Sequence, residues 1–248
     1  MGASLMARYT ASALVLGVHN WGDADKIVTL FTRERGLIRA AAFGARRPKS
    51  PLAAGLQMFN EIEAELTEGQ RLDTVRMASL LHHPKKLSED LAAMSYGSFV
   101  AELVREFLPE KQPEPAIYTL LGKVFAAFET RNARIVALMA AYQLMEHTGL
   151  QLSYERCAHC GKLLEGDAFF SEQAGGALCA EDRATDAVPY PAPLREFLAR
   201  IFAYDWRPDA SSTVTRDNLL AAEQMLIGYL QRLLGHPLKS LVFIHQLG

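Results

Sequence analysis

The sequence predicts an α+β protein in which a five-stranded β-barrel precedes a helical body with a small cysteine-containing insertion. Residues 9–80 contain short runs rich in apolar and β-branched residues, and in residues 60–66 apolar and polar residues alternate, which is the period of a strand with one buried face. Beyond residue 84 apolar residues recur at spacings of three and four, which is the period of amphipathic helices. Residues 150–190 follow neither period and contain all three cysteines.

The alternation that predicts the barrel is clearest in residues 60–66 (NEIEAEL), where Ile62, Ala64 and Leu66 alternate with glutamates. Glycine-containing turns separate the candidate strands, and five short strands of this total length are typical of an OB-fold. Residues 46–51 (RRPKSP) contain two prolines, which excludes them from a central strand, so we expect a basic loop there. The expected strands cover residues 10–18, 26–32, 37–43, 60–66 and 72–78.

The helical body is predicted from capping residues as well as from periodicity. We expect Ser88 to cap a first helix, Pro115 to begin a second, and a third to run over residues 134–147. Two more helices are expected over residues 193–204 and 215–235, and the apolar tail 238–247 should pack on the body. The first helix should bury a stripe of Leu91, Met94, Val100, Leu103, Val104 and Phe107. The expected domains are an OB-fold domain (1–81), two helical parts (82–150 and 191–248) and a zinc-binding insertion (151–190).

Composition excludes several classes of protein. The 248 residues suffice for one large domain or two modest ones, and the net charge of −2 gives no overall preference for nucleic acid. No apolar run approaches the ~18 residues of a membrane span. Residues 11–18 could start a signal peptide, but no small-residue cleavage site follows, so we reject that interpretation. An odd number of cysteines does not fit a secreted disulfide framework and favours a reducing, cytoplasmic compartment.

The cysteines form a recognisable metal-binding pattern. Cys157 and Cys160 make one Cys-x2-Cys pair, and Cys179 with Asp182 repeats the spacing after eighteen intervening residues. Two tight turns that each present residues i and i+3 complete a tetrahedron, as in zinc ribbons, and carboxylate is an accepted ligand. We therefore expect one structural zinc. Two alternatives stay open: a different fourth ligand, His159 or Glu181, or a decayed ribbon without metal.

A second pattern is a local concentration of positive charge. Residues 26–49 contain seven basic residues and a single acid, Glu34. We expect pairing of neighbouring strands to bring these cations together as a groove that follows a phosphate backbone, although an ordinary solvated surface is the alternative. Trp21 could stack on bases, whereas core packing is expected for Phe31 and Phe43. The candidate DNA-binding residues are Lys26, Arg33, Arg35, Arg39, Arg46, Arg47 and Lys49.

These motifs, in this order, resemble the RecO family of DNA repair proteins. Residues 22–50 (GDADKIVTLFTRERGLIRAAAFGARRPKS) resemble the family's N-terminal barrel, and Cys157-x2-Cys160-Gly161, residues 169–171 (FFS), Gly175-Gly176 and Cys179 resemble its zinc insertion. Order and spacing agree from about residue 9 to 248. The chain departs from the family at Asp23, where Glu is usual, and at Asp182, where the fourth cysteine would stand.

The resemblance implies a recombination mediator that binds single- and double-stranded DNA and anneals complementary strands. It implies action with RecR and with the single-strand DNA-binding protein, so that the strand-exchange recombinase can load, and a nucleoid-associated location. The residues themselves favour a non-enzymatic protein with no catalytic residues, because no nucleophile elbow, HExxH or phosphate loop occurs. The alternatives are an interaction scaffold without DNA affinity and, less in keeping with the motifs, a metal-dependent nucleic-acid hydrolase.

Overall fold

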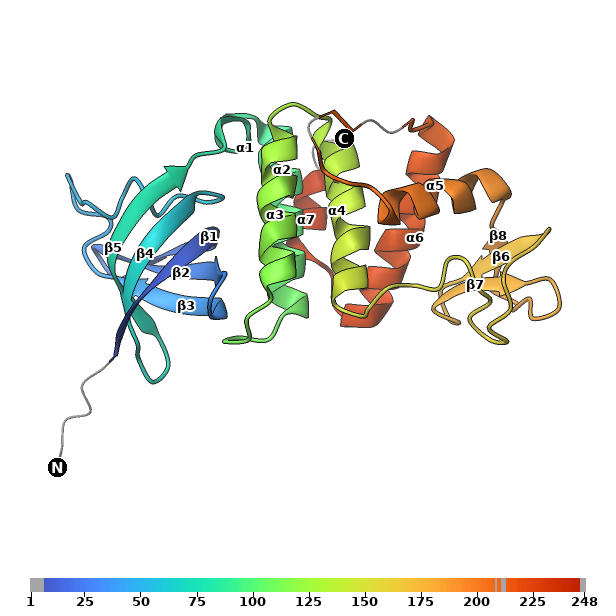
Figure 1. Ribbon diagram of the computed structural model, residues 1–248, viewed down its shortest axis with the longest axis horizontal. Helices are drawn as coiled ribbons and strands as arrows, with labels where there is room; N and C mark the ends of the chain where they lie inside the picture. The colour runs from blue at the N-terminus through green and yellow to red at the C-terminus, as the bar shows by residue number, and fades with distance from the viewer. Residues whose placement is uncertain (1–6, 208, 211–212, 246–248) are drawn as a thin grey trace. The chain divides into compact units, whose positions relative to one another are not determined.

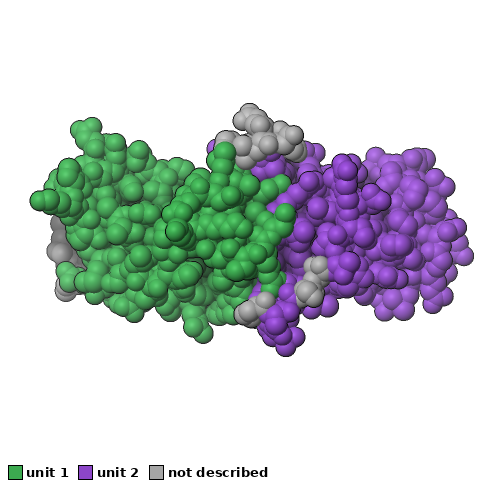
Figure 2. Space-filling view, turned by 90° about the horizontal axis from the view of Figure 1, so that it is seen from above, with its two compact units in different colours: residues 1–133 green, residues 134–248 purple. Residues whose placement is uncertain are grey.

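The computed structural model describes residues 7–207, 209–210 and 213–245 (Figure 1). The chain forms two compact units, residues 1–133 and 134–248, which Figure 2 shows in green and purple. The boundary falls inside the helical segment 82–150, which the sequence predicts to be a single part. The four-part division of the chain stays a prediction. Among the described residues no helix is both long and apolar enough to cross a membrane.

The first unit begins with a closed β-barrel in the strand order β1-β2-β3-β5-β4. Neighbouring strands are antiparallel except β3 and β5, which pair in parallel through Ala40–Asp73 and Ala41–Thr74. This order is that of an OB-fold, so the predicted fold class is confirmed. The strands are β1 (Arg8–Trp21), β2 (Asp25–Thr32), β3 (Gly36–Ala42), β4 (Glu61–Thr67) and β5 (Asp73–His82).

Alternation along the strands fills the barrel with small and branched side chains. Ile62, Ala64 and Leu66 point into the core, as predicted, and Val28 and Leu30 of β2 meet them there. Register shifts in β1 and at two places in β4–β5 mark bulges, which bend strands enough for closure. The interior is therefore a packed core, and any ligand must use the outer surface or the loops.

Three helices complete this unit: α1 (Lys85–Glu89), α2 (Leu91–Phe107) and α3 (Pro115–Phe128). Pro115 begins α3 as predicted. Ser88 is not the N-cap, because its hydroxyl donates to the Pro84 carbonyl, whereas the Asp90 carboxylate accepts from the Ala93 amide at 2.7 Å. Ser88 lies inside α1, and Asp90 is the residue that caps α2.

Of the expected stripe, Val100, Leu103 and Val104 are buried as predicted, but Leu91 and Met94 in the first turn are exposed. Ala93 and Gly97 face the core in their place. A Cβ on Gly97 would lie 3.3 Å from the Phe59 ring, so glycine lets α2 approach the barrel closely. Phe59 in turn makes an edge-to-face contact with Phe125 of α3. The helices thus cover one side of the barrel.

The second unit contains helices and a small sheet. Thr215 caps α6 through its hydroxyl and Gly235 ends it in the left-handed conformation, both as predicted. The three-stranded sheet β7-β6-β8 in residues 168–189 was not predicted. Residues 246 and 247, the end of the expected tail, lie outside the described residues. The elements are α4 (Ala133–His147), β6 (Ala168–Ser171), β7 (Gly176–Cys179), β8 (Val188–Pro189), α5 (Ala192–Phe202), α6 (Arg216–Leu234) and α7 (Lys239–His245).

Candidate metal centre and nucleic-acid interface

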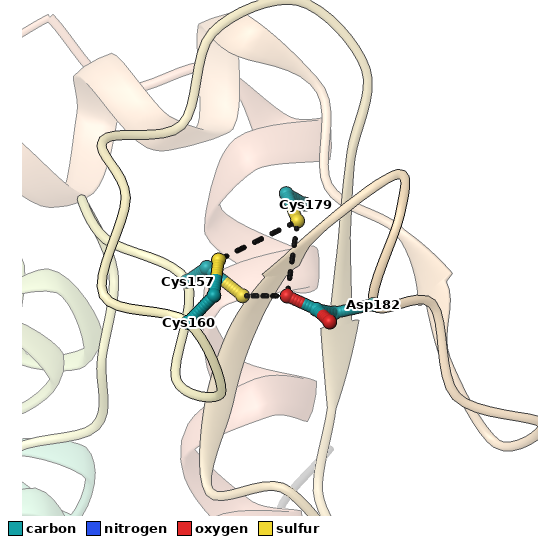
Figure 3. Close-up of side chains that lie close together, drawn as sticks. All are labelled: Cys157, Cys160, Cys179 and Asp182. Carbon is teal, nitrogen blue, oxygen red and sulfur yellow. Dashed lines mark hydrogen bonds between the residues drawn. The ribbon is translucent and has the colours of Figure 1, made fainter.

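The four predicted ligands converge at one point beside the small sheet (Figure 3). One ligand atom from each of Cys157, Cys160, Cys179 and Asp182 lies within 4.8 Å of the others. The Asp182 Oδ2 atom is 3.2 Å from the sulfurs of Cys157 and Cys179, and the Cys160 and Cys179 sulfurs are 3.9 Å apart. The four donors therefore face one another, with Cys157 buried and Cys160 at the exposed side of the cluster.

Two tight turns bring these donors together. In the first, the Gly161 amide donates to the Cys157 carbonyl, and Gly161 adopts a φ of 73°, which glycine tolerates at no steric cost. In the second, the Asp182 amide donates to the Cys179 carbonyl just after β7. Each turn thus places residues i and i+3 on the same side, which is the geometry expected from the Cys-x2-Cys spacing.

The donor set fits a tetrahedral ion such as zinc. Zinc–sulfur bonds of about 2.3 Å require tetrahedral edges of about 3.8 Å between sulfurs, and slightly less between sulfur and oxygen. The observed 3.9 Å and 3.2 Å separations differ from that by only a few tenths of an ångström. The cluster could therefore hold an ion with little rearrangement of its backbone.

The pKa values of the four donors depend on one another, and a bound cation would change them. Hydrogen bonding to Asp182 raises the pKa of the Cys160 thiol to about 12, because the carboxylate favours the protonated sulfur. The same thiols lower the pKa of Asp182 below its usual range. For Cys157, burial raises the pKa, but the amides of Cys160, Cys179 and His159 outweigh burial and lower it. A bound cation would neutralise the carboxylate and favour all three thiolates.

The two alternative fourth ligands have other partners. His159 Nδ1 lies 3.0 Å from Asp182 Oδ1, the oxygen that points away from Cys157 and Cys179. Glu181 pairs with Lys162 at 3.2 Å. Asp182 is thus the carboxylate that faces the sulfurs, and His159 holds its second oxygen.

The predicted DNA-binding residues divide into two groups at opposite ends of the β2–β3 hairpin. Thr32 pairs with Gly36 at one end, beside Arg33 and Arg35, whereas Lys26 pairs with Ala42 at the other. Six residue steps at about 3.4 Å separate these ends by about 20 Å. The expectation that strand pairing gathers all seven cations at one place is wrong.

The two groups also differ in how their side chains are used. At the turn, the Arg35 guanidinium lies 3.8 Å above the Tyr9 ring and pairs with Glu68 at 3.3 Å. At the other end, Arg46, Arg47 and Lys49 are exposed on the 43–52 loop, and the exposed Arg39 lies between the two groups. The loop end therefore presents the denser positive charge, and Lys26 lies next to it through its pairing with Ala42.

An aromatic pair accompanies the cations of the loop end. Trp21 and Phe43 have ring centroids 6.0 Å apart, and their exposed fractions are 45% and 54%. Core packing is confirmed for Phe31, which is fully buried, but it is wrong for Phe43. The core residues of β3 are Ile38, Ala40 and Ala42, so alternation already places position 43 outside.

Comparison with known proteins bears on both sites. Residues 6–84 match the family model described as Recombination protein O N terminal, and residues 88–242 match the one described as Recombination protein O C terminal. The chain belongs to the RecO family of DNA repair proteins. The DNA repair protein RecO of Symbiobacterium thermophilum is 33% identical over 98% of both chains. The RecO protein of Bifidobacterium animalis subsp. lactis is 33% identical over 95% of this chain and 98% of its own, and that of Myxococcus xanthus is 29% identical over 98% and 99%.

Arg76 is the residue near the RecO-type barrel's basic end that sequence reasoning missed. It lies on β5, outside the 26–49 window, and reaches the loop end only because β5 pairs with β3. No local signal in the sequence marks it. The parallel pairing of β3 with β5, which the OB-fold topology implies, is the signal from which its position could have been predicted.

Proposed function

We propose that the chain is a non-enzymatic recombination mediator that binds single- and double-stranded DNA through the loop end of its barrel. The observation that supports this best is the exposed loop-end group Arg46, Arg47 and Lys49, which lies beside exposed aromatic rings. The exposed Arg39 extends the positive charge along β3. Cations that follow a backbone bind every sequence, because phosphates carry no base information. DNA repair, the established role of the family, requires such sequence tolerance.

The proposed activity is annealing of complementary strands, without nucleotide and without divalent ions in solution. Cations reduce the repulsion between two phosphate backbones, and backbone contacts leave base edges available for pairing. Resemblance to the family supports the further proposal that the protein acts with RecR and the single-strand DNA-binding protein to load the recombinase. An interaction scaffold without DNA affinity remains the second candidate.

We propose that the metal centre holds one structural zinc. Among the described residues, Cys157, Cys160, Cys179 and Asp182 form the only cluster of metal-binding type. Four protein ligands complete a tetrahedron and leave no open position for a reacting water, which a catalytic or hydrolytic site needs. When bound, the ion would cross-link the two turns.

The DNA-binding proposal is tested by titrating labelled single strands at several salt concentrations. If about five cations meet phosphates, log K should fall against log salt with a slope of roughly −3 to −4. The variant R46A/R47A/K49A should flatten that slope by about half, whereas the matched turn variant R33A/R35A should change it less, because Arg35 is already paired.

Three outcomes would contradict these proposals. A slope and affinity unchanged in both variants would place DNA binding elsewhere, and absence of any salt-dependent binding would favour the scaffold. An absolute requirement for ATP in annealing would contradict the nucleotide-free mechanism.

A further inference from the structure

Beside the Trp21–Phe43 pair lies a groove whose lining includes Arg47 and Lys49 of the loop end. It has a volume of about 420 Å³ and runs between the 43–52 loop and the start of β5. Ligand pockets of about 300–1,000 Å³ hold small organic molecules, so this groove has room for a nucleotide. Phe43 lines it, together with Arg47, Lys49 and Arg76.

The positive charge of the groove favours an anionic ligand. Its three cations face no acidic residue among the lining side chains. Arg76 donates through Nε to the Thr67 hydroxyl at 3.0 Å, which fixes its guanidinium and uses one of five N–H donors. Phosphate oxygens are the natural acceptors for such a fork.

The loop that carries the cations is held in place before any ligand arrives. The Gly44 amide donates to the Asp25 carboxylate at 2.7 Å, and Arg46 donates to the carbonyls of Gly22 and Ala24. Lys49 has a φ of 65° and stands between two prolines, at positions 48 and 51. A preset loop loses little conformational freedom on binding, so its contacts contribute more fully to affinity.

The exposed ring of Phe43 distinguishes single strands from duplex. A base offers its face to an aromatic side chain only when it is unstacked from its neighbours, and every base has such a face. The Trp21 ring contacts the Phe43 ring but does not line the groove. We therefore expect bases to stack on Phe43, and the fluorescence of Trp21 to respond when they do.

We propose that this groove binds single-stranded DNA, with one base stacked on Phe43 and the adjoining phosphates on Arg47, Lys49 and Arg76. The inference rests on the proposed DNA-binding function and specifies its subsite. It separates two contributions: stacking, which depends on bases, and charge, which does not.

The test compares two labelled probes of equal charge, a 15-residue oligothymidylate and a 15-residue strand without bases. The native chain should bind the oligothymidylate about tenfold more tightly, the size expected for one stacked base. Phe43→Leu should remove that preference and leave the affinity for the baseless strand unchanged. Leu81→Ala, which removes another exposed apolar side chain of the barrel, should keep the preference.

The phosphate contacts are tested with the same probes. Arg76→Gln should weaken binding of both strands severalfold and reduce the salt slope by about 0.7, the contribution of one phosphate on a single strand. Arg216→Gln, at an exposed position in the second unit, should change neither. Oligothymidylate should also quench emission from Trp21, and Trp21→Phe should abolish the quenching, because the other tryptophan, Trp206, is buried.

The outcomes separate this inference from the function on which it rests. Equal affinity of the native chain for both probes, or a Phe43→Leu variant that still prefers oligothymidylate, would overturn the groove assignment while DNA binding stands. Failure of the native chain to bind either probe at low salt would overturn the proposed function and the groove with it.

Discussion

The barrel and the cysteine segment achieve order by different means. Every barrel strand contributes to one continuous core, from Ala13 of β1 to Val75 of β5. The cysteine segment has a small core cluster of Cys157, Leu178 and Ala187, and one of these is a candidate metal ligand. Its other buried residues, such as Phe170 and Tyr190, lie outside that cluster. Apolar burial at roughly 25 cal/mol per Å² stabilises the large core of the first region more than the small cluster of the second. We therefore expect the segment to depend on the proposed metal and the barrel not to.

The largest effect should follow from removing half of the metal centre. Replacing Cys157 and Cys160 by Ser should release nearly all bound zinc, because structural zinc contributes on the order of 10 kcal/mol to such segments. Amide exchange should become fast in β6 and β7 and stay slow in β1–β5. Metal analysis and hydrogen exchange check both statements. Retained protection in β6 and β7 would show that the segment folds without metal.

The converse experiment weakens the barrel alone. Leu30 is fully buried in its core, so Leu30→Ala should lower the free energy of unfolding of the barrel by about 2–5 kcal/mol. Zinc content should stay at one per chain. Leu163→Ala, at a position 56% exposed, is the matched control and should change stability little. Loss of zinc in the Leu30 variant would mean that the two regions are not independent.

The sequence predicted correctly those features that depend on residues close together in the chain. Strand alternation in 60–66, Pro115 before α3, and Thr215 and Gly235 around α6 are local signals, and the structure agrees with all of them. The spacing of the four metal donors is also local, and they converge as expected. The strands β6–β8 went unseen because two to four residues are too few to show a period.

The sequence-based predictions failed where a feature depends on contacts between distant segments, or where two neighbouring residues could serve equally well. Ser88 and Asp90 are both good caps, two residues apart, but a short helix α1 that the sequence did not reveal includes Ser88, and Asp90 caps α2. The separation of Arg33 from Arg46 follows from strand register, which periodicity does not give. Arg76 joins the basic end only through the β3–β5 pairing.

A smaller effect is expected at the fourth ligand. Asp182→Ala should weaken zinc retention, whereas Asp182→Cys should strengthen it, because thiolate suits zinc better than carboxylate. Competition with a colorimetric chelator measures both. Equal retention in the two variants and the native chain would mean that residue 182 is not a ligand.

The smallest effect concerns the histidine behind that ligand. His159 holds Asp182 Oδ1, so His159→Leu should lower zinc affinity by about tenfold, as loss of an outer hydrogen-bond partner does. The matched variant Lys162→Leu removes the neighbouring Lys162–Glu181 ion pair and should have less effect. A loss as large as that of Asp182→Ala would instead make His159 a ligand.

Removing the metal from the native chain tests the central contrast most directly. After extraction by a chelator, hydrogen exchange and oligothymidylate binding are measured on the same sample. Fast exchange should appear in β6 and β7, while exchange in β1–β5, DNA affinity and its salt slope stay as in the metal-bound protein. DNA affinity that falls in proportion to the metal removed would contradict the assignment of DNA binding to a self-sufficient barrel.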